Sequence, residues 1–408
     1  MSVNLSNISG LLKQMYSKDA IVELENLETP FLSLLSDAPE VQVGGAGLYF
    51  AVTVKGNASA AFRAEGQSIP APGNPVPKQA TVSAKRLLGQ AQVDGLAKAS
   101  TGNNETAFAN AFQYALDREL AAALRFKEGA AFRDGTGQLA LFNGPSGNTA
   151  STAQGVDTPG AHWLKINDRI DVFNTADVLV ATATVTDVDP LGDTIKTDTD
   201  ISGLIADNYK IYKAGTQTTN GSVATAEMLG MAAHIASSGT YLGISRTTYR
   251  NWAGNVVDAG STPVTEDLLF RALNQIEIVG GMTNPAGFKI VMHPDQRRKY
   301  LELTLPQKQF SGLNMDAGYS KLTFNGMPIV TAYSCPSDVV YIGDFSKLKK
   351  VYVPGEELHV ESEYNGSAIK WLPGYDACIA YFREYGNMVC TKPNSFVKIS
   401  ALTGVTSR

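Results

Sequence analysis

The residues able to do chemistry in this 408-residue chain are few and scattered. The four histidines, His162, His234, His293 and His359, lie far apart, and none has a second ligand at the spacing of a metal site. The sequence contains no Walker loop, no nucleophile elbow, no H-E-x-x-H pair and no dinucleotide fingerprint. We therefore expect no catalytic residue, no cofactor and no metal, and we expect that the chain is not an enzyme.

Two local patterns suggest a binding site, but each is better explained by structure. The glycine-rich run Gly44–Gly47 leads into a strand, so it cannot present a helix N-terminus to a phosphate. The aspartates between Asp187 and Asp200 suggest calcium, yet their spacing is not that of an EF-hand loop, and Asp189 precedes Pro190. Turn formation is the favoured explanation for these aspartates.

The three cysteines, Cys335, Cys378 and Cys390, predict neither a zinc site nor a disulfide framework. Their number is odd, their spacing is wide, and no C-x-x-C motif is present. All three lie in apolar, strand-like segments, where a free cysteine usually packs as a small hydrophobic residue. This usage fits folding in a reducing compartment.

Composition excludes several classes of protein. The net charge is −5, so extensive neutralisation of phosphates is not expected. Hydrophobic residues make up 44% of the chain and charged residues only 18%, which leaves a surface suited to burial by other subunits. No apolar run approaches 18 residues and no secretory signal is visible, so we expect no membrane association.

The most informative segment extends from Leu48 to Leu96 and is predicted to be a two-stranded arm with almost no core of its own. The outgoing strand alternates, with Phe50, Val52 and Val54 on one face and polar residues on the other. The returning strand covers residues 80–93. The connection between the two strands contains four prolines that interrupt any ladder: Pro70, Pro72, Pro75 and Pro77. A lone hairpin of this length is not stable in water, so it should lie against something else, and a second copy of the chain is favoured.

The segments on either side of this arm also have clear patterns. Residues 1–46 are expected to form an extended arm, in which the apolar run from Phe31 to Leu35 packs on another element or on a neighbouring subunit. A long helix is predicted from Thr106 to Arg133, after caps at Asn103 and Asn104. Its apolar positions recur at helical spacing, namely Phe108, Phe112, Leu116, Leu120 and Leu124.

The second half of the chain divides into a β-rich module and an α/β part. After a flexible loop over 145–160, residues 163–213 alternate as short strands and predict a small barrel or sandwich inserted into a larger domain. Helices are then expected over 226–237, 265–279 and 294–303, with a buried strand over 288–294 and an exposed loop over 306–320. A pair of long apolar strands, around residues 377–390 and 395–402, closes the chain.

In this order, the parts resemble the major capsid protein family of tailed bacteriophages, with the Hong Kong 97-type fold. Four local stretches carry the resemblance over nearly the whole chain: Leu27–Phe31 before the hairpin, DGTG at Asp134–Gly137, FNGMPIV at Phe324–Val330, and VVYIGDFSKLKKVYV at Val339–Val353. The implied fold class is α+β, with an N-terminal arm, an extended β-hairpin called the E-loop, a spine helix, a P-domain and an A-domain, plus the small inserted β-rich module. The implied domains are the N-terminal arm 1–46, the E-loop hairpin 47–97, the P-domain with its spine helix 98–160, the inserted module 161–215, the A-domain and connections 216–350, and the returning P-domain strands 351–408.

The resemblance also implies a function and a set of partners. The chain would self-assemble, as hexamers and pentamers, into the icosahedral shell that encloses the double-stranded DNA genome of a tailed bacteriophage. It would enclose this DNA without sequence-specific binding, would be made in the host bacterial cytoplasm, and would end in the virion. Because the arm begins near Met1, a separate scaffolding protein is expected, together with a portal and, optionally, a decoration protein. The contacts between subunits would be made by residues of the arm and hairpin region: Phe31, Leu34, Phe50, Val52, Val54, Phe62, Arg63, Glu65, Lys85 and Arg86.

Three alternatives remain open from the sequence. An encapsulin-like nanocompartment resembles the same fold but packages protein. A carbohydrate-binding β-rich protein would use the 163–213 module and would leave the arm over 48–96 unexplained. A hydrolase is disfavoured by the missing motifs.

Overall fold

The computed structural model describes most of the chain and divides it into two compact units. The described residues are 28–38, 42–44, 47–57, 59–95, 105–143, 154–157, 160–190, 192–201, 203–217, 227–279, 287–310, 322–361 and 370–403. Unit 1 contains Ala84–Glu128 and Tyr352–Gly386. Unit 2 contains Pro30–Ser83, Gly129–Val351 and the chain from Asn387 onward.

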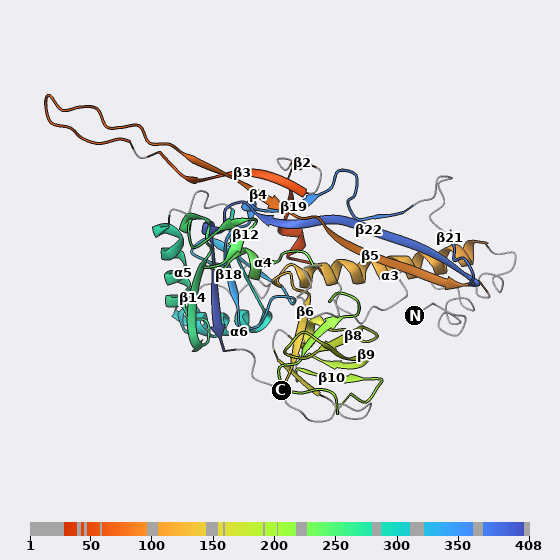
Figure 1. Cartoon of the computed structure of the whole chain (residues 1–408). Coiled ribbons are helices and arrows are strands. Elements are labelled where there is room, and N and C mark those ends of the chain that lie inside the picture. Colours follow the sequence, from red (N-terminus) through yellow and green to blue (C-terminus); the bar gives the residue numbers. More distant parts are fainter. Residues whose placement is uncertain are drawn as a thin grey trace. The chain divides into compact units, whose positions relative to one another are not determined.

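Unit 1 is a narrow antiparallel sheet with one long helix against it (Figure 1). Its elements are β5 (Lys85–Asp94), α3 (Glu105–Ala130), β20 (His359–Val360), β21 (Lys370–Trp371) and β22 (Ala377–Cys390). β5 pairs with β22 along its whole length, from Asp94 opposite Ala377 to Lys85 opposite Gly386. Alternate residues of β5 are buried with Leu116 of α3, because one face of a strand pair must be covered to exclude water.

The long helix confirms the prediction in type and length, with two differences. It ends at Ala130 rather than Arg133, and Leu124 is exposed rather than part of the buried stripe. Near the C-terminal end of α3, the Lys127 ammonium lies 2.6 Å from a carboxylate oxygen of Glu384, and both side chains are buried. The predicted caps Asn103 and Asn104 lie outside the described residues.

The central sheet of unit 2 has six strands in the order β14–β23–β18–β15–β17–β16. These strands are β14 (Asn255–Thr262), β15 (Phe288–Met292), β16 (Thr323–Phe324), β17 (Met327–Thr331), β18 (Val340–Asp344) and β23 (Phe396–Leu402). The pairs β14–β23 and β15–β17 are parallel, and the other pairs are antiparallel. The inner strands are buried on both faces, which explains why their sequences are continuous apolar runs rather than alternating ones.

Helix α5 (Glu266–Ile278) packs on this sheet, as its predicted apolar face requires. The Thr265 side chain caps it by accepting the backbone N–H of Leu268 at 3.2 Å. Helix α6 (Pro294–Phe310) extends further than the predicted 294–303 and includes part of the expected loop. The predicted helix over 226–237 shortens to α4 (Met231–His234).

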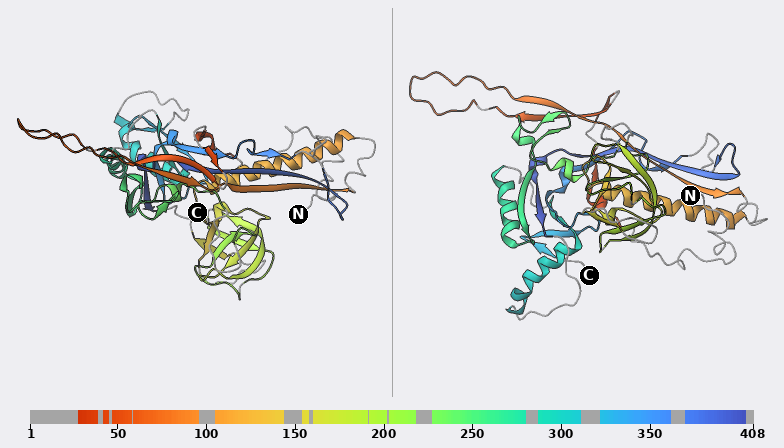
Figure 2. Two further views of the ribbon diagram at one scale, coloured as in Figure 1. Left: turned by 45° about the horizontal axis from the view of Figure 1, so that its top comes forward. Right: turned by 60° about the horizontal axis from the view of Figure 1, so that its bottom comes forward.

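A closed six-stranded barrel follows α3 within unit 2 (Figure 2). Its strands are β6 (Gln138–Phe142), β7 (Gln154–Asp157), β8 (Arg169–Phe173), β9 (Leu179–Asp189), β10 (Thr194–Thr197) and β11 (Lys210–Lys213). The expected small barrel over 163–213 is therefore confirmed, but it begins earlier, because β6 and β7 complete it. Its aspartates bond to the backbone, as turn residues do: Asp198 accepts the Thr184 N–H at 2.7 Å and Asp189 accepts the Gly192 N–H at 3.2 Å.

Strand β1 (Ser36–Asp37) pairs in parallel with β19 (Leu348–Tyr352), and both belong to the six-stranded sheet that contains β22. Two small sheets remain in unit 2. One is the hairpin sheet of β2 (Gln42–Gly44), β3 (Gly47–Lys55) and β4 (Val76–Val82), and the other is the finger formed by β12 (Thr240–Tyr241) and β13 (Ile244–Ser245).

Two expectations about pairing were wrong. The predicted returning strand over 80–93 is two strands, and only β4 returns along β3, while β5 joins β22 of unit 1. The two closing apolar strands also separate, because β22 pairs with β5 whereas β23 lies in the central sheet of unit 2. In both cases the chain changes its pairing partner across a short connection, which is residues 83–84 in the first case and residues 391–395 in the second.

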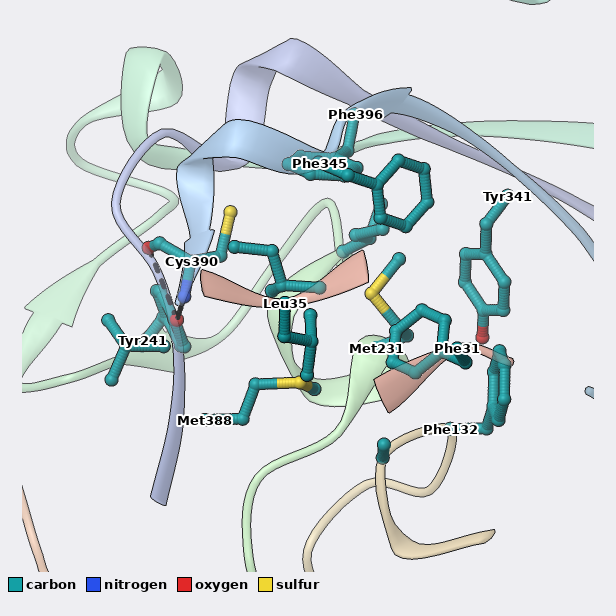
Figure 3. Packing of buried hydrophobic residues seen from close by; sticks show 14 of the residues in the cluster. Phe31, Leu35, Phe132, Met231, Tyr241, Tyr341, Phe345, Met388, Cys390 and Phe396 are labelled. Atoms are coloured by element: carbon teal, nitrogen blue, oxygen red, sulfur yellow. Dashed lines mark hydrogen bonds between the residues drawn. The ribbon is translucent and has the colours of Figure 1, made fainter. Parts of the chain in front are cut away.

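The largest hydrophobic cluster of unit 2 collects side chains from segments far apart in the sequence (Figure 3). Phe31 and Phe132 lie with ring centroids 4.5 Å apart, and Phe345 meets Phe31 edge-on at 6.1 Å. This cluster also holds the inner face of the β3–β4 hairpin through Leu48, Ala80 and Val82.

A buried polar network lies inside this cluster. The Tyr241 hydroxyl lies 2.7 Å from His234 Nδ1 and accepts the Cys390 backbone N–H at 2.9 Å. The Arg246 guanidinium lies over the Tyr241 ring and donates to the carbonyl oxygens of Ala233 and His234, each at 2.7 Å. These bonds satisfy polar groups that would otherwise be costly to bury.

We predict that Gly230→Ala destabilises the fold. A Cβ at Gly230 would lie 2.3 Å from the Arg133 carbonyl oxygen and 2.5 Å from that of Ala130, so backbone must move. The expected loss is about 1–3 kcal/mol of unfolding free energy, measured by urea denaturation. Gly203→Ala is the matched control, because nothing lies within 4 Å of its Cβ position; equal losses in the two variants would contradict the prediction.

We also predict that the subunit loses stability in mild acid through His234. Burial lowers the pKa of His234 to about 3, and nearby Arg246 acts in the same direction, while the backbone of Leu229 opposes both. In the unfolded chain His234 takes up a proton near pH 6.5, whereas in the folded chain it stays neutral until about pH 3. Its contribution to the free energy of unfolding is therefore complete above about pH 6.5 and is lost as the pH falls towards 3.

The loss across this window should be on the order of a few kcal/mol, measured by chemical denaturation at a series of pH values. His234→Gln keeps an acceptor for the Tyr241 hydroxyl but cannot titrate, so its unfolding free energy should depend less on pH. An unchanged pH slope in this variant would assign the loss to other groups.

Candidate assembly surface

The β3–β4 hairpin has two chemically different faces. Leu48, Val54, Ala80 and Val82 are buried on the inner face, and Phe50 and Val52 pack partly buried against the main cluster beside them. The side chains of Ala51, Thr53, Pro77, Gln79 and Thr81 are exposed on the opposite face. The predicted alternation is confirmed, but the apolar face packs on the subunit's own core rather than on a second copy.

Beyond the paired strands, the hairpin continues as an extended loop without a ladder (Figures 1 and 2). Its two large apolar side chains, Phe62 and Ile69, are 109% and 91% exposed. Arg63 and Glu65 are exposed next to Phe62. Exposed aromatic and branched aliphatic side chains on a loop with no core mark a surface that another chain covers.

The prolines explain where the ladder stops. Pro70, Pro72 and Pro75 lie in the extended loop, as expected from their missing N–H groups. Pro77, however, lies within β4 opposite Thr53. It is tolerated because alternate residues of β4 direct their N–H groups away from β3, as Thr81 does, and a ladder bond is not lost there.

The N-terminal candidates differ in exposure. Phe31 is fully buried between Phe132 and Phe345, so its side chain has no surface left for a neighbouring subunit. Val54 is likewise 5% exposed and belongs to the subunit core. For these two residues, the structure replaces the expected contact role with an internal one, whereas the half-buried Leu34 keeps a partly accessible side chain.

Lys85 and Arg86 lie on β5 of unit 1 and not in the hairpin. Lys85 is half-buried, and burial lowers its pKa. Arg86 is exposed, with its guanidinium carbon 5.9 Å from the centroid of the Tyr385 ring. Leu88, two residues later, is 62% exposed and was not among the predicted contact residues. Its place in the alternating strand, on the same face as Arg86, Gln90 and Gln92, is the signal that could have identified it.

A groove of about 780 Å³ lies beside the outer part of the hairpin within unit 2. It is lined by residues of β3 and β4, by Lys349 of β19, by Ala38 just after β1 and by Thr391 just after β22. The polar lining residues are Tyr49, Thr53, Lys78, Gln79, Lys349 and Thr391. Part of the hairpin strands is therefore accessible from this groove.

The described residues contain no group of three or more His, Cys, Asp or Glu side chains able to hold a metal. The three cysteines are buried and belong to no disulfide. Burial raises the pKa of Cys335 and Cys390, which keeps these thiols protonated. His293 pairs with Asp295, with Nδ1 2.6 Å from the carboxylate oxygen. None of the helices in the described ranges is long and apolar enough to cross a membrane.

The sequence itself matches no protein-family model and no curated protein. Solved structures do match. The capsid asymmetric unit of Cyanophage A-1(L) aligns at 12% identity and TM-score 0.56, over 95% of this chain and 98% of that one. The capsid of a native GTA particle aligns at 12% identity and TM-score 0.50, over 97% of both chains. The SrpI encapsulin complex of Synechococcus elongatus PCC 7942 aligns at 10% identity over 98% of this chain and 97% of that one, with a TM-score of 0.47 that is too low to support an inference.

The two stronger matches span nearly the whole chain. At 12% identity they establish the fold and not the residues that act in it. The chain therefore has the Hong Kong 97-type fold.

Proposed function

We propose that this chain is the major capsid protein of a tailed bacteriophage and self-assembles into the icosahedral shell that encloses the double-stranded DNA genome. The observation that carries the proposal is the extended loop of the β3–β4 hairpin, whose Phe62 and Ile69 are exposed on a segment without a core. Such a loop contributes contact area only when another subunit lies beneath it. A closed shell provides such a neighbour for every copy.

The parts of the capsid fold can then be assigned to the described elements. The hairpin β3–β4 with its extended loop is the E-loop, ending near Val82, and α3 is the spine helix. Unit 1 is the P-domain, and the central sheet of unit 2 with α5 is the A-domain. The barrel formed by β6–β11 is the inserted module, and the segment with Phe31 and Leu34 belongs to the N-terminal arm, expected over 1–46.

The charge and composition of the chain support a container rather than a nucleic-acid-binding protein. A net charge of −5 gives no general attraction for DNA, so the enclosed genome would be held without sequence-specific contacts. The subunits would form hexamers and pentamers, and a scaffolding protein, a portal and optionally a decoration protein would be partners. The assembled chain would reside in the virion after synthesis in the host cytoplasm.

The proposal assigns the contact role to the residues whose side chains remain accessible. These are Leu34, Phe50, Val52, Phe62, Arg63, Glu65, Lys85 and Arg86, together with the newly identified Ile69 and Leu88. Burying one such apolar side chain contributes about 1.5–3 kcal/mol, and a shell repeats the contact in every subunit. Small contributions per subunit therefore add to a stable particle.

We predict that deleting residues 59–73 leaves the subunit folded and abolishes shells. The deletion removes the extended loop but keeps the paired part of β3 and β4, so the core is unchanged. Thermal unfolding should shift little, while negative-stain electron microscopy should show no particles. Shells of normal size from the shortened chain would contradict the E-loop assignment.

We predict that Phe62→Ser weakens assembly without affecting the fold. Losing about 1.5–3 kcal/mol per contact corresponds to roughly a 10- to 100-fold higher concentration needed for assembly, measured by light scattering. Gln67→Ser, on the same loop and equally exposed, is the matched control. Equal effects of the two substitutions would show that Phe62 makes no specific contact.

The contents of purified particles test the choice between a virus and a nanocompartment. Nuclease-protected double-stranded DNA in particles from infected cells supports the capsid proposal. A protein cargo with no protected DNA would instead assign the chain to an encapsulin-like compartment. A chain that stays monomeric at high concentration would reject both shells.

A further inference from the structure

The turn that joins β12 to β13 has an unusual residue in a demanding position. Leu242 has φ 51° and Gly243 has φ 82°, so both central residues of this two-residue turn are left-handed. Such turns favour Asn-Gly, because a side chain with a Cβ crowds the backbone in this conformation. A leucine there indicates that the position has a role beyond closing the turn.

That role is visible in the contacts of Leu242. Its side chain is 8% exposed and belongs to the main cluster of unit 2. Its carbonyl oxygen accepts the backbone N–H of Thr81 at 3.1 Å. Thr81 lies on β4, on the edge away from β3, so the turn holds the hairpin at its free edge.

Tyr241, the residue before Leu242, anchors the finger to the core by hydrogen bonds. The Tyr241 hydroxyl accepts the Cys390 N–H at 2.9 Å (Figure 3). It also lies 2.7 Å from His234 Nδ1. The Tyr241 carbonyl accepts Trp252 Nε1–H at 3.1 Å, and the Trp252 ring lies 6.4 Å from that of Phe50 on β3. The adjacent residues Tyr241 and Leu242 thus connect the finger to the core and to the hairpin, respectively.

A second attachment holds the end of β4. Asn387 Nδ2 donates to the Ser83 carbonyl at 2.8 Å, and its Oδ1 accepts the Leu229 N–H at 2.9 Å. The hairpin is therefore bonded at Thr81 and Ser83, whereas Pro77 and Gln79 further along the same edge are exposed. The hydrogen bonds from the chain at Thr81 and Ser83 to Leu242 and Asn387 therefore both lie at the base of the hairpin.

We propose that the β12–β13 finger is a positioning clamp, in which Leu242 holds Thr81 and Tyr241 anchors the finger, so that the hairpin leaves the subunit in one direction. The inference rests on the proposed function, because the direction of the hairpin matters only if its loop must reach a neighbouring subunit. The clamp places the contact residues of the loop, and it makes no contact with the neighbour itself.

The test compares two proline substitutions on the same strand edge. Thr81→Pro removes the N–H that Leu242 accepts, and Gln79→Pro removes an N–H at the same edge for which no acceptor is found among the described residues. Neither substitution removes a bond to β3, as natural Pro77 illustrates. Both variants therefore introduce a proline at the same edge of β4, but only Thr81→Pro removes the hydrogen bond to Leu242.

The first readout is the direction of the hairpin in the unassembled full-length chain. Spin labels are attached to Lys55→Cys at the end of β3 and to Asn274→Cys on α5, and the distance between the two labels is measured. The three native cysteines are buried, so the labels react with the two introduced cysteines. We expect a broader distance distribution for Thr81→Pro, with roughly a two- to tenfold larger displaced population, the change expected for one lost hydrogen bond. Gln79→Pro should match the parent chain, and equal distributions in both variants would overturn the clamp.

Tyr241→Phe supplies an independent variant if Thr81→Pro does not fold. It removes only the hydroxyl that binds Cys390 and His234, and Tyr249→Phe is its control. Broadening in Tyr241→Phe alone supports the clamp, and no broadening contradicts it.

Assembly is the second readout and separates this inference from the proposed function. If the parent chain forms shells, Thr81→Pro should give fewer regular shells and more irregular particles than Gln79→Pro at equal concentration. If the parent forms no shells, the proposed function fails, while the distance measurement still decides whether the clamp exists.

Discussion

The structure depends on one constraint, which is that the far end of the β3–β4 hairpin cannot bury its apolar residues within its own chain. Only the base of the hairpin meets the core, through Leu48, Ala80 and Val82. Further out, prolines remove ladder donors, and Phe62 lies entirely in solvent. In a single subunit the apolar side chains of this segment therefore stay exposed to water, and association with a further chain would bury them.

The core of unit 2 can be understood as the support for that hairpin. One cluster beneath the hairpin contains Phe31 from the first part of the chain, Phe132 from the segment after α3, and Cys390 from the end of β22. Because interiors are close-packed, a change at one of these positions is transmitted to the others rather than absorbed. The buried polar network around Tyr241 adds direction to this packing, since hydrogen bonds, unlike apolar contacts, fix orientation.

The candidate site is accordingly a distributed surface rather than a pocket with reactive groups. The histidines and cysteines that the sequence offers are used in packing and in internal hydrogen bonds, as with His234 and Cys390. Energy in such a surface comes from repetition of modest contacts around a closed assembly.

The sequence alone determined the elements whose pattern is local. Alternation along residues 48–55, the long helical stripe before Ala130 and the Thr265 cap each depend on near neighbours, so the corresponding strand and helices were predicted correctly. Tertiary structure decided what the pattern cannot encode, namely the partner of each apolar face. It assigned β5 to β22 rather than to β3, buried Phe31 in its own core, and left Phe62 exposed, because hydrophobic burial is non-directional and depends on which distant surfaces meet.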